Sequence, residues 1–135
     1  MNSHNNAAAH ARLRLFGVAS AAALLLTAAS SRAAAAAGDA DRGETLYQGC
    51  QDCHSLDKND VGPKHRGVFG RKAGSIADYS YSDGLKQSGL TWDEASLDKW
   101  LTDPQAFIPG AKMFYHLSEA QDRADVIAFL KERAR

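Results

Sequence analysis

The only two cysteines of this 135-residue chain lie three positions apart, and a histidine directly follows the second. They are Cys50, Cys53 and His54, within the segment CQDCHSL. Thiols and imidazole can bind a metal ion, a pair of thiols can form a redox-active disulfide, and two thiols can also be alkylated by a cofactor. The segment therefore suggests three kinds of chemistry: a structural zinc site, a thiol redox pair, or covalent attachment of haem.

Two of these interpretations lack supporting residues. A structural zinc site needs four ligands, and after residue 37 the only further histidines are His65 and His116. A thioredoxin-like pair follows a strand and begins a helix, but no segment rich in Val, Ile or Thr precedes Cys50. Haem attachment needs only the two thiols, which add to the vinyl groups, and the adjacent histidine, which reaches the iron. The segment favours haem attachment, with zinc or thiol chemistry as the remaining alternatives.

A second axial ligand for the iron is available at Met113, the only methionine after Met1. It lies in the segment IPGAKM, where proline and glycine favour an irregular loop that can cross a haem face. A lone methionine more often fills a gap in a core, but thioether sulfur paired with histidine suits a haem electron carrier. The rival ligands His65 and His116 are interpreted as surface histidines.

The first 37 residues have the layout of a secretory signal peptide. Two arginines precede an apolar run at residues 15–29, and small residues follow, so cleavage is expected after Ala35 or Ala37. The run is shorter than the ~20 apolar residues that span a bilayer, which disfavours the alternative of an uncleaved anchor. The sequence therefore predicts a signal peptide over residues 1–37, a domain over 38–135, and a periplasmic location.

The charge of the exported part argues against nucleic-acid binding. The chain has 16 basic and 16 acidic side chains, and three of the arginines lie before residue 38, which leaves 13 basic residues and a net charge of −3. Binding to a phosphate backbone needs an excess of Lys and Arg over one face. With 44% hydrophobic and 24% charged residues, the composition is that of one ordinary globular domain, small enough to benefit from a cofactor.

Three segments have the capping and periodicity of helices. The first runs from a cap at Asp39 to about Gly49, and the second covers residues 94–102. The third is expected to begin at Ser118, with Gln121 completing a capping box. Residues 55–90 show little helical periodicity, so this long loop is expected to be ordered by a cofactor and the apoprotein to be largely unfolded.

Five motifs occur in one order: GDADRGETLYQGCQDCH, GPKHRGVFGRKAG, YSYSDGLKQSGLTW, FIPGAKM and RADVIAFLKE. Over residues 38–133 the chain thereby resembles the class I cytochromes c, specifically the soluble bacterial type that is similar to the mitochondrial carrier. The resemblance implies an all-α cytochrome c fold, with three main helices and long loops wrapped around one haem c, bound covalently through Cys50 and Cys53. It also implies that the first and last helices cross at Gly43 and Phe129.

The function that the resemblance implies is that of an electron carrier, not an enzyme. The His/Met-ligated iron would cycle between ferric and ferrous states. A ligand-binding or peroxidatic haem protein, in which Met113 is a labile ligand, is the alternative.

The resemblance also assigns roles around the haem. The carbonyl of Pro63 would accept a hydrogen bond from His54, and Arg71, Tyr81 and Trp92 would hydrogen-bond the haem propionates.

Three positions depart from the family pattern, which often has asparagine, threonine and tyrosine where this chain has Leu85, Ala111 and Trp100. These changes remove polar contacts and are expected to leave Met113 less tightly held. The segment from Met113 to Arg123 is also about one residue shorter than in the mitochondrial protein.

Partners are expected to be redox proteins such as oxidases, reductases or dehydrogenases, bound to a monomer that has no stable membrane insertion. A basic stretch could guide such encounters or be a solvated loop without a partner. It comprises Lys58, Lys64, Arg66, Arg71 and Lys72, with Lys112 beside the proposed ligand. A separate acidic group comprises Asp93, Glu94, Asp98 and Asp103.

Overall fold

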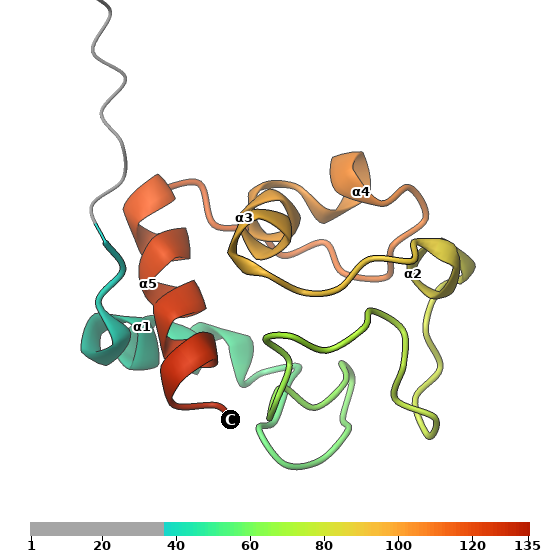
Figure 1. The fold of residues 1–135 in the computed structure, drawn as a ribbon, viewed down its shortest axis with the longest axis horizontal. Helices are drawn as coiled ribbons and strands as arrows, with labels where there is room; N and C mark the ends of the chain where they lie inside the picture. The colour runs from blue at the N-terminus through green and yellow to red at the C-terminus, as the bar shows by residue number, and fades with distance from the viewer. Residues whose placement is uncertain (1–36) are drawn as a thin grey trace, which may run out of the picture. The chain divides into compact units, whose positions relative to one another are not determined.

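The computed structural model describes residues 37–135, so the predicted signal peptide lies almost wholly outside the described residues. Within them the fold is helical and contains no strand, only one antiparallel bridge between Lys72 and Thr91. The helices are α1 (Ala40–Tyr47), α2 (Asp83–Gln87), α3 (Glu94–Thr102), α4 (Pro104–Phe107) and α5 (Ala120–Glu132), with a 3-10 turn, η1, at Gln48–Cys50 (Figure 1). The predicted all-α class is confirmed. None of the helices in this part of the chain is long and apolar enough to cross a membrane.

Helix α1 begins where the sequence predicts. The Asp39 carboxylate accepts hydrogen bonds from the backbone N–H groups of Asp41, at 2.9 Å, and Arg42, at 3.2 Å. These bonds satisfy donors that have no partner within the first turn. The helix continues directly into η1, which ends at Cys50. The capped helix therefore fixes the position of the first cysteine.

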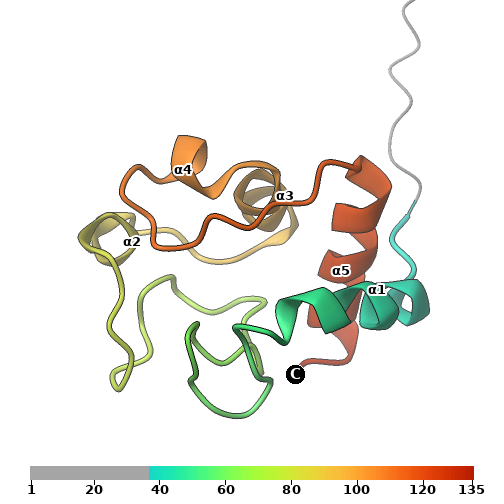
Figure 2. The same cartoon turned by 180° about the vertical axis from the view of Figure 1, so that it is seen from behind.

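Helices α1 and α5 cross, as Figures 1 and 2 show, and Gly43 of α1 lies against α5. A Cβ atom at Gly43 would overlap the backbone carbonyl of Asp125 and lie 3.0 Å from the Cβ of Phe129. The two backbones can approach this closely only because glycine has no side chain. On the same contact, the rings of Tyr47 and Phe129 lie 4.9 Å apart. The predicted pairing of Gly43 with Phe129 is confirmed.

A buried carboxylate ties the start of α1 to α5. Asp125 is 1% exposed and accepts bonds from the backbone N–H of Asp39 at 2.8 Å, the amide of Gln121 at 2.9 Å and the guanidinium of Arg42. Burial acts to raise the pKa of Asp125, but these donors outweigh it, so the pKa lies below its usual value. Asp125 is therefore ionised at neutral pH, and its charge is compensated.

The predicted start of the last helix is wrong. Glu119 occupies the cap position of α5 and makes no side-chain cap hydrogen bond, and the helix begins at Ala120. The guanidinium of Arg123 binds the carbonyls of Leu117 at 2.9 Å and Ser118 at 2.8 Å. These bonds hold residues 117–118 against the first turn of α5, and the cap lies one residue later than the predicted Ser118.

Two short helices were not predicted, because four or five residues are too few to show a period. Ser82 caps α2 through the backbone N–H of Leu85, at 3.3 Å. Asp103 caps α4 through the N–H groups of Gln105 and Ala106, both at 3.0 Å, and α4 begins with a proline. By contrast, α3 matches its predicted bounds, and its cap Asp93 forms a capping box with Ser96.

Candidate cofactor site

A cavity of about 480 Å³ lies between the helices and the long loops. This volume falls within the ~300–1,000 Å³ typical of cofactor sites. Its lining is predominantly apolar and is drawn from α1, α2, α3, α5 and the loops. Every site residue predicted from the sequence contributes to this lining: Cys50, Cys53, His54, Pro63, Arg71, Tyr81, Trp92 and Met113.

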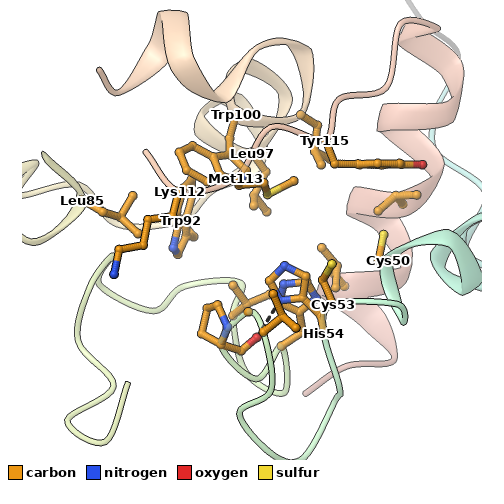
Figure 3. Close-up of a pocket in the computed structure, with 18 of the residues that line it drawn as sticks. Cys50, Cys53, His54, Leu85, Trp92, Leu97, Trp100, Lys112, Met113 and Tyr115 are labelled. Carbon is orange, nitrogen blue, oxygen red and sulfur yellow. Dashed lines mark hydrogen bonds between the residues drawn. The ribbon is translucent and has the colours of Figure 1, made fainter. Parts of the chain in front are cut away.

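One wall of the cavity holds His54 in a defined orientation (Figure 3). Its Nδ1 donates a hydrogen bond to the carbonyl oxygen of Pro63, at 2.7 Å. A Cβ atom at Gly62 would overlap the imidazole, so glycine is required beside the ring. Burial lowers the pKa of His54, although the bond to Pro63 acts in the opposite direction. A neutral imidazole with its proton on Nδ1 leaves Nε2 available for a metal.

The two cysteines belong to the same wall and are not joined to each other. Cys50 is half-buried and Cys53 is exposed. Burial, with a smaller contribution from Cys53, raises the pKa of the Cys50 thiol to about 11. Across residues 37–135, no group of three or more His, Cys, Asp or Glu side chains is arranged to hold a metal ion. The arrangement therefore gives the zinc alternative no support.

Met113 lies on the opposite side of the cavity from His54 (Figure 3). Its loop is braced by Gln105, whose amide donates to the carbonyls of Ala111 at 2.6 Å and Met113 at 2.9 Å. Gln105 was not identified from the sequence, because nothing in one chain marks a half-buried glutamine as a brace. The methionine segment therefore has polar support from a side chain outside the predicted set.

The three residues assigned to a cofactor's carboxylates also reach the cavity. Tyr81 and Trp92 are buried, and Arg71 is half-buried. Two Arg71 nitrogens donate to the carbonyls of Arg66 at 2.9 Å and Lys64 at 2.8 Å, and burial lowers the pKa of the guanidinium. A positive charge and two further donor groups are thus held beside an apolar space, where an anionic group would need partners.

The prediction that His65 is a surface residue is wrong. Its ring stacks on that of His54, with centroids 3.9 Å apart and planes inclined by 20°, and its Nδ1 lies 2.9 Å from the Tyr47 hydroxyl. Burial, followed by the neighbouring His54 and Arg71, holds the pKa of His65 well below its usual value. Stacked rings cannot bind one iron from opposite faces, so this position does not suit a rival axial ligand. His116 is exposed, as predicted.

The departures from the family pattern make the site more apolar. Leu85 and Trp100 line the cavity, and Ala111 is buried. The ring of Trp100 meets that of Trp92 edge-on, with centroids 5.4 Å apart. The wall that holds Met113 is therefore built from hydrophobic packing more than from side-chain hydrogen bonds.

Several charges in the two predicted groups have structural partners. Arg66 pairs with Asp57, and Lys112 donates to the carbonyl of Ser80 at 2.8 Å. Among the acids, Asp93 and Asp103 cap helices, as described above. Asp98 pairs with Arg123 at 2.7 Å. The basic stretch therefore offers fewer unpaired charges than its sequence suggests.

Loops that enclose an apolar cavity between helices, with Cys-x-x-Cys-His on one wall, define a class of small proteins that attach haem through thioether bonds. The chain belongs to the cytochrome c family, whose model, described as "Cytochrome c", matches residues 40–134. It is 53% identical to cytochrome c2 of Rhodomicrobium vannielii over 98 residues, which are 70% of this chain and 78% of that protein.

Relatives also occur outside bacteria. The chain is 44% identical to cytochrome c of Arabidopsis thaliana over 103 residues, covering 73% of this chain and 92% of that protein. Among solved structures it resembles cytochrome cH from Methylobacterium extorquens, with a TM-score of 0.68, 50% identity, and coverage of 71% of this chain and all of that one. The fold predicted from the five motifs is thereby confirmed.

Proposed function

We propose that this protein is an exported monohaem electron carrier with His54 and Met113 as axial ligands of the iron. One observation carries the proposal: His54 and Met113 lie on opposite sides of a single apolar cavity, whose histidine wall also holds both cysteines. Cytochrome c family membership and relatives named cytochrome c2 support the haem and the carrier function.

Covalent attachment would use Cys50 and Cys53. Each thiol would add its S–H bond across one vinyl C=C bond of the haem, giving one C–S and one C–H bond, so no atom would leave and no oxidant would be consumed. Once bound, the haem supplies an iron that accepts and releases one electron. His54 is oriented by the hydrogen bond that its Nδ1–H donates to the carbonyl of Pro63, while the apolar side chains around Met113 exclude water. If His54 and Met113 both held the iron, they would leave no position for a substrate, which favours a carrier over an enzyme.

Export is the part of the proposal that depends on residues 1–37. An arginine-led apolar run followed by small residues supports a cleaved signal peptide and periplasmic function of residues 38–135. Intact-mass measurement of the secreted protein tests it. A chain beginning at residue 36 or 38, plus one haem, supports the proposal, whereas a full-length mass contradicts it.

Docking of redox partners would use the exposed rim of the cavity. Val61 is 71% exposed, Phe114 75% and Tyr115 47%, and all three line the same cavity as Lys112. Apolar side chains beside a positive charge suit brief contacts between a monomer and other redox proteins. Electron-transfer rates with candidate oxidases, reductases and dehydrogenases, measured over a salt series, would identify the partner.

Two spectra test the central proposal. The pyridine haemochrome spectrum should have the position of a haem with both vinyl groups saturated, and the ferric protein should show the far-red sulfur-to-iron charge-transfer band. Met113→Ala should abolish that band, while the exposed control His116→Ala should keep it. A wild-type protein with thioether haem but no far-red band would instead support the ligand-binding or peroxidatic alternative.

A further inference from the structure

A partly buried hydrogen bond joins α1 to the loop beside His54. The hydroxyl of Tyr47, a residue that is 1% exposed, lies 2.9 Å from Nδ1 of His65. Burial raises the pKa of the Tyr47 hydroxyl far above its usual value, so the phenol keeps its proton. A phenol is a good donor and an unprotonated imidazole nitrogen a good acceptor, so we assign Tyr47 as the donor. His65 is then neutral, with its own proton on Nε2.

The backbone around His65 is also fixed. Its N–H donates to the carbonyl of Ser55 at 3.0 Å, and its carbonyl accepts from the N–H of Val68 at 2.8 Å. Both ends of the residue are therefore restrained, the backbone by the loop and the ring by Tyr47. A ring held in this way cannot follow small movements of its neighbours.

The ring that it contacts is His54. The two imidazoles are 3.9 Å apart and nearly parallel, and the edge of His54 is held by the Nδ1 bond to Pro63. A bond at one edge leaves the ring able to rotate about that bond, whereas a flat neighbour on its face prevents this rotation. The bond to Pro63 therefore fixes the edge of the His54 ring, and the stacked His65 ring fixes its plane.

We propose that Tyr47 and His65 are a positioning pair that sets the plane of the His54 ring and lowers the reduction potential of the haem iron. This inference rests on the proposed function, because it concerns His54 as an axial ligand. The ferric iron draws electron density from its imidazole more strongly than the ferrous iron does. The electron-rich face of a neutral His65 therefore stabilises the ferric state more than the ferrous state.

The test uses the holoprotein and three variants: His65→Leu, Tyr47→Phe and the control Tyr79→Phe. Tyr79 is matched because its hydroxyl also lies at this cavity but donates to the carbonyl of Val61, at 2.6 Å. The readouts are the reduction potential and the proton NMR shifts of the haem methyl groups in the ferric state. Those shifts depend on the orientation of the axial ligand planes, which a purely structural role of His65 would leave unchanged.

We expect His65→Leu to raise the potential and to change the methyl shift pattern. Tyr47→Phe should change the pattern in the same sense by a smaller amount, because the stacked ring remains but loses its anchor. Tyr79→Phe should leave both readouts as in the wild type. If His65→Leu does not take up haem, the comparison of Tyr47→Phe with Tyr79→Phe decides the outcome.

The inference is overturned if the variants of the pair match Tyr79→Phe in potential and methyl pattern, even where their melting temperatures fall. The far-red band and the haemochrome spectrum of the wild type separate this result from failure of the proposed function. If both are present while the potential and methyl pattern do not respond, only the positioning role fails. If the wild type lacks thioether haem, the proposed function itself fails.

Discussion

Replacement of Gln105 by leucine should loosen the methionine side of the site. The amide makes two hydrogen bonds to the carbonyls of Ala111 and Met113, and each contributes about 1 kcal/mol net to stability. Their loss should favour opening of the loop by about 2 kcal/mol, which corresponds to roughly 30-fold in an equilibrium constant. If a water molecule replaces one of the two bonds in the closed loop, about 1 kcal/mol remains, which corresponds to about fivefold.

Imidazole binding to the ferric holoprotein measures this opening. If Met113 is an iron ligand, as proposed, imidazole can bind the iron only when Met113 has left, so its apparent affinity reports the population of the open loop. We expect Gln105→Leu to bind imidazole about 5- to 30-fold more tightly, followed by loss of the far-red band. Gln87→Leu makes the same change at an exposed position on α2 and should match the wild type. Equal imidazole affinity in Gln105→Leu and Gln87→Leu would refute the claim that Gln105 holds the Met113 loop closed.

Four other predictions concern folding. Asp125→Ala should lower the free energy of unfolding by about 3 kcal/mol in urea titrations, because three buried or partly buried donors lose their acceptor. The pKa of Asp125 is lowered by folding, so its contribution is present above the unfolded pKa of about 3.9 and is lost as pH falls through the folded value. Asp125→Asn should therefore show a shallower loss of stability in acid than the wild type, and equal slopes would contradict the assignment. Gly43→Ala should destabilise by about 2 kcal/mol, measured by the same titration, because the added Cβ overlaps the α5 backbone. Haem-free protein should show little helical circular dichroism, and a cooperative melting transition in it would contradict a role of haem in folding.

The sequence correctly predicted those helix starts that depend on contacts between residues close together in the chain. The caps at Asp39 and Asp93 lie within three residues of the donors they satisfy, so a single sequence contains the whole interaction. Ser118 has the same local pattern, yet the carbonyls of residues 117 and 118 are bound by Arg123, and Asp98, which pairs with Arg123, is 20 positions from Ser118. The local pattern therefore does not show the long-range contacts that also hold the backbone before this helix.

The site shows the same division between near and distant contacts. Cys50, Cys53 and His54 lie within five positions of one another, so the sequence alone identifies them as one site. Met113 was added to that site because it is the only methionine after Met1. His65 was misassigned because a histidine in a polar loop is usually exposed, and its partner Tyr47 lies 18 positions earlier on α1. That partnership becomes visible only once the fold is known.

Tyr47 connects the helix crossing to the ligand wall, so the two are not independent parts of the molecule. Its ring packs on Phe129 of α5, its hydroxyl bonds His65, and η1 follows it directly. A change that moves α1 away from α5 must therefore shift Tyr47, and with it the ring that stacks on His54. The carbonyl of Met113 is held instead by Gln105 on α4. A substitution that strains the crossing should accordingly disturb the histidine side of the haem more than the methionine side. The affinity for imidazole depends on the methionine side and should stay closer to that of the wild type.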